Sequence, residues 1–84
     1  MEIKYSTKAD EDLEFWIKSG NKKILKRIAQ LTKAILENPS QGIGKLEALK
    51  FGLSGKWSRR ITEHRFIYQI EIDTLKVYSL KGHY

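Results

Sequence analysis

The strongest constraint on the fold is a single change in hydrophobic period near the middle of the chain. Between about residues 22 and 37, apolar side chains recur every three or four positions, which is typical of an amphipathic α-helix. From Leu46 onward, short apolar runs alternate with polar residues, which is typical of β-strands. Because the helical and strand-like halves are separated along the sequence, the pattern favours an α+β domain.

The first half of the chain is expected to contain one short strand and two helices. Residues 2–5 alternate polar and apolar side chains, as in a strand. The hydroxyls of Ser6–Thr7 suit the start of a helix, and Gly20 suits its end. Asn21 is a good cap for the second helix, which the segment Asn-Pro-Ser at residues 38–40 is expected to end.

The second half is expected to contain four strands. They are assigned to residues 46–52, 57–63, 66–72 and 75–80, with a turn at Asp73–Thr74. The expected order is therefore strand, helix, helix and four strands, in one domain that spans residues 1–84. Two helices would cover one face of a small, mainly antiparallel sheet and leave its other face open to solvent or substrate.

Composition removes several functional classes. The chain has no cysteine, and its two histidines, His64 and His83, lie far apart, so neither a thiolate nor a compact histidine metal site is expected. We therefore expect no metal and no other cofactor. No apolar run is long enough to cross a membrane or to act as a signal peptide, and the cytoplasm is the expected location.

Positive charge is concentrated in one segment. The chain has a formal net charge of +6, and residues 45–65 hold six lysines and arginines against two glutamates. Phe51 and Trp57 lie among these cations, which is typical of a nucleic-acid-binding surface. An ordinary basic protein that is kept soluble by its charge would show the same totals, so composition leaves both interpretations open.

Three pairs of residues could move protons or bind phosphate: Glu47 with Lys50, Arg59 with Arg65, and His83 with Tyr84. Cleavage of RNA by its own 2′-hydroxyl needs a base, fixed positive charge and an acid for the leaving 5′-oxygen. Glu47 is the candidate base, and His83 is the candidate acid. The two arginines would supply the charge, while Lys50 would hold a phosphate and Tyr84 would stack on a base.

Each of these residues also has an ordinary structural interpretation. Most glutamates are simply exposed, adjacent arginines such as Arg59–Arg60 often form a solvated edge, and the ends of chains usually fray. His64 is interpreted as structural, because a buried imidazole with a hydrogen-bonded partner is common in turns. Periodicity alone does not show that the reactive groups converge.

Two stretches resemble the Txe/YoeB family of the RelE-like bacterial toxins. The first is GIGKLEALK at residues 42–50, which is similar to the family's G-x-G-K-x-E-x-L-K stretch. The second is LSGKWSRRITEHRFIY at residues 53–68, together with His83–Tyr84. Asp12, Trp16 and residues 22–28 also resemble the helical half of the family, so the resemblance covers nearly the whole chain.

The resemblance implies a toxin that cleaves mRNA in the ribosomal A site and so inhibits translation. The implied fold is a microbial-RNase-like α+β domain, and the implied chemistry is metal-independent attack by the 2′-hydroxyl. Glu47 matches the family's general base, Arg65 its phosphate-stabilising arginine and His83 its general acid. The family's supporting, RNA-binding positions are matched by Lys50, Arg59 and Tyr84.

The resemblance also implies partners, namely mRNA and ribosomal RNA at the A site and an antitoxin of the Phd/YefM type. Relatives often form homodimers, but the oligomeric state of this chain stays open, and operator DNA would be bound only together with the antitoxin. Two other functions stay open: a non-catalytic inhibitor that binds RNA or the ribosome, and a DNA-binding co-repressor that acts with the antitoxin. The basic segment supports all three functions, whereas an acid at His83 has an evident use only in cleavage.

The sequence departs from the family pattern just before His64–Arg65, where the family typically has one more residue after its Arg-Arg-Ile run. A deletion inside a strand would turn every following side chain to the other face of the sheet. We therefore expect the shorter connection to lie in a turn or bulge near residues 62–64.

Overall fold

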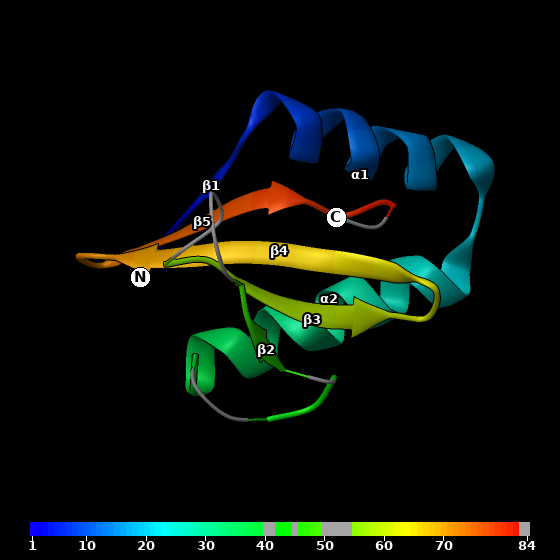
Figure 1. The fold of residues 1–84 in the computed structure, drawn as a ribbon. Coiled ribbons are helices and arrows are strands. Elements are labelled where there is room, and N and C mark those ends of the chain that lie inside the picture. The colour runs from blue at the N-terminus through cyan, green and yellow to red at the C-terminus, as the bar shows by residue number, and fades with distance from the viewer. Residues whose placement is uncertain (40–41, 45, 50–54, 83–84) are drawn as a thin grey trace.

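Seven elements are described, and they follow one another in the expected order (Figure 1). The computed structural model describes residues 1–39, 42–44, 46–49 and 55–82. The elements are β1 (Glu2–Tyr5), α1 (Thr7–Ser19), α2 (Lys22–Glu37), β2 (Glu47–Ala48), β3 (Trp57–Ile61), β4 (His64–Glu71) and β5 (Thr74–Ser79). The predicted α+β class, with two helices before a run of strands, is confirmed.

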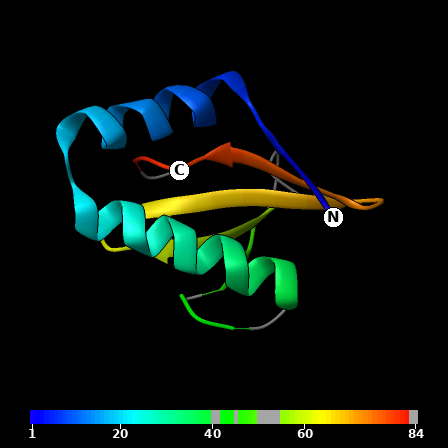
Figure 2. The same ribbon diagram turned by 180° about the vertical axis from the view of Figure 1, so that it is seen from behind.

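The five strands form one sheet in the order β1–β5–β4–β3–β2. β1 runs parallel to β5, and all other neighbouring strands are antiparallel. Both helices cover the same face of the sheet, with α1 beside β5 and α2 beside β3, as Figures 1 and 2 show from opposite sides. The other face carries no helix among the described residues.

Local capping chemistry sets the ends of both helices. The hydroxyl of Ser6 accepts a hydrogen bond from the Ala9 N–H, which caps α1 one residue before the first helical position. Gly20 ends α1 with a φ of 70°, a left-handed conformation that glycine adopts at little cost. The Asn21 side chain then accepts from the Ile24 N–H and starts α2. The predicted caps at Ser6, Gly20 and Asn21 are therefore confirmed.

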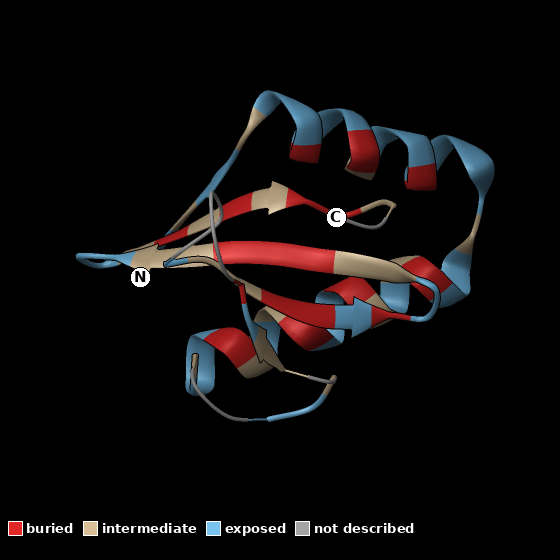
Figure 3. Cartoon of the chain, in the orientation of Figure 1, coloured by how far each residue is buried: buried red, intermediate tan, exposed pale blue. Residues whose placement is uncertain are grey.

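The core lies between the two helices and one face of the sheet (Figure 3). Ile24, Ile28, Leu31 and Ile35 of α2 are buried at the helical spacing that the sequence shows. They pack in one cluster with side chains from the sheet and α1: Ala9, Trp16, Ile61, Phe66, Tyr68, Leu75, Val77 and Leu80. The apolar face of α2 therefore packs against the sheet and helps to position its strands.

Several strand boundaries differ from the predictions, and β3 ends at Ile61 rather than at residue 63. β2 is only two residues long within the described chain, and residues 50–52 of the predicted strand lie outside the described residues. β4 begins at His64 rather than at Phe66. Ile72 is not in a strand but in the turn with Asp73, and its side chain is 94% exposed. Asp73 has a φ of 51°, which Asp tolerates better than most residues, so the turn lies one residue earlier than predicted.

The connection between β3 and β4 is the turn that the sequence predicted near residues 62–64. Ile61 pairs with His64, so only Thr62 and Glu63 lie between the strands. Thr62 adopts a φ of 51°, an unfavourable conformation for a β-branched residue.

No helix of the described residues has the length and apolar character needed to cross a membrane.

Candidate active site

Strand register places two predicted catalytic residues on the same face of the sheet. Glu47 in β2 is opposite Ser58 in β3, and Ser58 is opposite Ile67 in β4. Directly opposed residues share a face of a sheet, as do alternate residues of one strand. Arg65 lies two residues before Ile67 in β4, so Arg65 and Glu47 both lie on the face without helices. Two strand spacings, about 10 Å, separate their strands across the sheet.

Glu47 is held by the short ladder between β2 and β3. Its side chain is half-buried, and the next residue but one, Leu49, is buried and donates its N–H to the Lys56 carbonyl at 2.9 Å. Gly44 lies just before this strand with a φ of 77°. A Cβ there would approach Leu31 Cδ2 to 2.8 Å, so only glycine lets the chain pass this close to α2 on its way to Glu47.

Arg59 does not lie where its predicted role in RNA binding requires. It is opposite Phe66, on the core face of the sheet, and its side chain is fully buried. The guanidinium donates to the Asn38 carbonyl at 2.9 Å and to the Ile43 carbonyl at 3.2 Å. The register of β3 therefore corrects the prediction: Arg59 holds the segment between α2 and β2 from inside, and it is Arg60 that lies on the outer face.

Tyr68 completes the contact that Arg59 makes. Arg59 Nε donates to the Tyr68 hydroxyl at 3.2 Å, and that hydroxyl donates to the Pro39 carbonyl at 2.8 Å. Burial raises the pKa of the Tyr68 phenol, an effect that the nearby Arg59 charge partly opposes. The phenol therefore stays protonated at neutral pH and can act as the donor to Pro39.

The end of the described chain is fixed beside Arg65. The Arg65 N–H donates to the Gly82 carbonyl at 3.1 Å, and the Gly82 N–H donates to His64 Nδ1 at 2.8 Å. These bonds give His64 the structural role that the sequence suggested. His83 is the next residue along the chain after Gly82, although His83 and Tyr84, like Lys50, lie outside the described residues.

The segment that leads to Gly82 is anchored to α1 by two residues. Asp12 Oδ2 accepts from the Leu80 N–H at 2.9 Å and from Lys8 Nζ at 2.7 Å. Trp16 Nε1 donates to the Leu80 carbonyl at 3.0 Å. The Trp16 and His64 rings pack edge to face, with 4.8 Å between their centroids. The sequence signal for this anchor was a carboxylate on the apolar side of α1, between Ala9 and Trp16.

Comparison with known proteins decides what kind of protein carries this site. The family model for YoeB-like toxins of bacterial type II toxin–antitoxin systems matches residues 5–84. A toxin YoeB of Synechocystis sp. is 51% identical over 70 residues, which cover 82% of this chain and 81% of that protein. The toxin YoeB of Escherichia coli K12 is 40% identical over 85 residues and covers 100% of both chains.

The chain belongs to the YoeB toxin family.

Solved structures of YoeB proteins have the same fold. A YoeB/ParE toxin from Agrobacterium tumefaciens is 33% identical, with a TM-score of 0.94 over 100% of both chains. YoeB in a heterotetrameric YoeB–YefM toxin–antitoxin complex from Staphylococcus aureus is 41% identical, with a TM-score of 0.89 over 100% of this chain and 98% of that one. The Staphylococcus aureus YoeB is also known as a dimer. This YoeB-family chain is thus a toxin of a type II toxin–antitoxin system.

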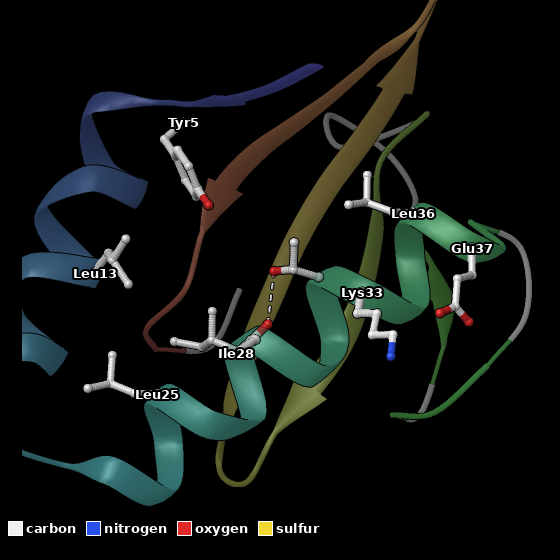
Figure 4. Close-up of a pocket in the computed structure, with 9 residues that line it drawn as sticks. Tyr5, Leu13, Leu25, Ile28, Lys33, Leu36 and Glu37 are labelled. Carbon is white, nitrogen blue, oxygen red and sulfur yellow. Dashed lines mark hydrogen bonds between the residues drawn. The ribbon is translucent and has the colours of Figure 1, made fainter. Parts of the chain in front are cut away.

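A separate hollow lies on the helix-covered side of the sheet, and none of the predicted catalytic residues lines it. It measures about 540 Å³ and lies between β1 and the two helices (Figure 4). Leu13, Leu25, Ile28 and Leu36 make most of its wall apolar, and Tyr5 lies at one end.

Among the described residues, no group of three or more His, Asp or Glu side chains could hold a metal ion.

Proposed function

We propose that this toxin cleaves mRNA on the ribosome by attack of the 2′-hydroxyl on the adjacent phosphate. The observation that supports the proposal is that Glu47 and Arg65 share the helix-free face of the sheet, while hydrogen bonds to His64 and Arg65 fix Gly82, the residue before His83. A base, a cation and an acid can then act on one phosphate. These are the three groups that such a reaction needs.

Each residue has one role in the proposed reaction. Glu47 takes the proton from the 2′-hydroxyl, whose oxygen bonds to phosphorus. Arg65 stabilises the additional negative charge on the phosphoryl oxygens. His83 gives its proton to the 5′-oxygen as the bond between phosphorus and that oxygen breaks. The products are a 2′,3′-cyclic phosphate on one fragment and a 5′-hydroxyl on the other.

Three further residues support this reaction in the proposal. Lys50 binds a neighbouring phosphate, and Tyr84 stacks on a base of the mRNA. Arg59 acts as a positioning residue, because its guanidinium ties the Asn38 and Ile43 carbonyls and so holds the segment that leads to Glu47. This replaces the direct contact with RNA that the sequence predicted for Arg59.

The partners follow from relatives and are part of the proposal. Because YoeB of Staphylococcus aureus forms a complex with YefM, we expect an antitoxin of the Phd/YefM type to neutralise this toxin in the cytoplasm. The dimer of that relative makes a homodimer the expected free form. Operator DNA would be bound only in the complex with the antitoxin.

The test is cleavage of an mRNA in a translation reaction, mapped by primer extension. Glu47→Gln and His83→Ala are each expected to lower the cleavage rate by about 10²- to 10⁴-fold, the usual effect of removing one proton-transfer group. Glu37→Gln is the matched control, because Glu37 is exposed at the end of α2 and lies outside the proposed site.

Ribosome binding separates this function from the two alternatives. Both catalytic variants are expected to bind ribosomes as the wild-type toxin does. If translation were still inhibited by Glu47→Gln and His83→Ala at wild-type potency, the toxin would be a non-catalytic binder. If neither protein bound ribosomes but both repressed transcription with the antitoxin, the co-repressor function would replace the proposal.

A further inference from the structure

A basic surface continues from Arg65 around the edge of the sheet to α2. One hollow of about 320 Å³ is lined by Arg60, Thr62, Glu63 and Arg65. A second hollow of about 470 Å³ is also lined by Arg60 and Thr62. Its other lining residues come from α2: Lys23, Lys26, Arg27 and Gln30. Because both hollows are lined by Arg60 and Thr62, they adjoin each other, and together they outline a path that starts at the candidate catalytic arginine.

The topology of the sheet leaves this path open. β2 pairs only with Trp57 and Ser58, so the last three residues of β3 have a described strand on one side only. Arg60 is exposed at that edge. On α2, residues 23, 26, 27 and 30 recur at the spacing of one helix face, and that face is turned to the same edge. An extended polymer could therefore pass from Arg65, on the helix-free face of the sheet, to α2.

The larger of the two hollows is strongly positive. We name Lys23, Lys26, Arg27 and Arg60 the α2–β3 basic surface. Among the residues that the structure describes, none of the four forms an ion pair, and no carboxylate lines the larger hollow. Four cations held this close repel one another, so a polyanion that binds here is favoured electrostatically. The nearby Glu63 lies at the end towards Arg65 and borders only the smaller hollow.

Arg27 lies near the segment that leads to Glu47. It is half-buried, and a Cβ at Gly44 would lie 3.5 Å from Arg27 Nη2. Gly44 belongs to the segment that leads to Glu47. An anion bound by Arg27 would therefore lie beside that segment.

We propose that the α2–β3 basic surface binds phosphates of the RNA strand that flank the cleaved one. This inference rests on the proposed function, since it takes Arg65 as the site of the reacting phosphate. A row of cations along two adjoining hollows fits a strand with regularly repeated phosphates better than a single small anion. The surface would raise the affinity for longer RNA without touching the reacting atoms, and such contacts fix register rather than sequence.

The test uses Lys23→Ala/Lys26→Ala, which removes two exposed cations of the surface. Lys4→Ala/Lys33→Ala is the matched control, because it removes the same charge from exposed lysines of β1 and α2 that line neither hollow. Binding of uncleavable 2′-O-methyl RNA of three and of nine nucleotides is measured by fluorescence anisotropy over a range of salt concentrations.

The nine-nucleotide RNA is expected to bind the Lys23→Ala/Lys26→Ala protein about 25-fold more weakly at 0.1 M salt, because each lost contact with a single strand removes about 0.7 from the salt slope. The slope should fall by about 1.4 in total, while the trinucleotide and the control variant show no more than a twofold change. Equal binding of the nine-nucleotide RNA by both double variants would overturn the inference.

Two further measurements separate other outcomes. A DNA duplex with the same number of phosphates should bind more weakly than the RNA, and tighter duplex binding with a larger loss in the variant would assign the surface to DNA and overturn the inference. Cleavage on ribosomes by Glu47→Gln tests the proposed function independently. Cleavage at the wild-type rate in that variant would reject the proposed function, whatever the binding of the nine-nucleotide RNA shows.

Discussion

Two adjacent arginines show how much a single position in a strand decides. Arg59 and Arg60 have the same side chain, and alternation predicts only that they face opposite sides of the sheet. The structure places Arg59 in the core, with hydrogen bonds to Tyr68, Ile43 and Asn38, and leaves Arg60 exposed. The sequence could not assign the two roles, because the partners of Arg59 are mostly backbone carbonyls, which carry no residue-specific signal.

Replacement of Arg59 should therefore cost stability. Arg59→Met keeps much of the apolar volume but removes the donor to the Tyr68 hydroxyl and to the part-buried Asn38 and Ile43 carbonyl oxygens, which costs about 3 kcal/mol of unfolding free energy in total. The exposed neighbour is the control, because Arg60→Met is expected to change the unfolding free energy by less than about 0.5 kcal/mol. Urea denaturation followed by tryptophan fluorescence measures both values. Equal stability of the two variants would show that the buried hydrogen bonds of Arg59 contribute nothing net.

At the scale of elements, the segment that follows β5 is positioned by α1, which lies far from it in the sequence. Asp12 of α1 accepts the Leu80 N–H, and Trp16 donates to the Leu80 carbonyl. This anchor holds the chain where it turns towards Gly82, whose own bonds to His64 and Arg65 follow within two residues. A catalytic group that follows this segment can act only if the segment is fixed, because misplacement of the group by about 1 Å can lower the rate about 10²-fold.

Asp12→Asn should loosen this anchor. The neutral amide loses the charge-assisted bonds to Leu80 and Lys8, which should lower the unfolding free energy by about 1–2 kcal/mol. The Leu80 and Gly82 amide protons should exchange faster with solvent, and cleavage on ribosomes should fall by about tenfold. Asp10→Asn, an exposed change in the same helix, is the control for both measurements. Unchanged exchange at Leu80 would show that Asp12 does not anchor the segment.

Local signals predicted the elements well, and distant contacts limited the rest. The caps at Ser6, Gly20 and Asn21 act within a few residues, so the sequence contains all the information they need. The pairing of β1 with β5 joins the two ends of the chain and leaves no periodic signal. The early start of β4 at His64 depends on its pairing with Ile61 across the turn.

At the scale of the whole molecule, the helices and the site occupy opposite faces of one sheet. The period of α2 predicts the side of the helix that packs on the sheet, and the register of β2, β3 and β4 places Glu47 and Arg65 on the sheet face without helices. That Glu47 and Arg65 share a face was beyond periodicity alone, because it requires knowing which strands are neighbours. The proposed positions of Lys50, His83 and Tyr84 rest on the family resemblance.

The chemistry of the cut RNA ends tests the central claim most directly. If Glu47, Arg65 and His83 catalyse attack by the 2′-hydroxyl, mRNA cut by the wild-type toxin on ribosomes must end in a 2′,3′-cyclic phosphate or its 3′-phosphate hydrolysis product. The downstream fragment must begin with a 5′-hydroxyl, which accepts labelled phosphate from polynucleotide kinase without prior dephosphorylation. Fragments with a 3′-hydroxyl and a 5′-phosphate would show that water attacked instead, and would contradict the account.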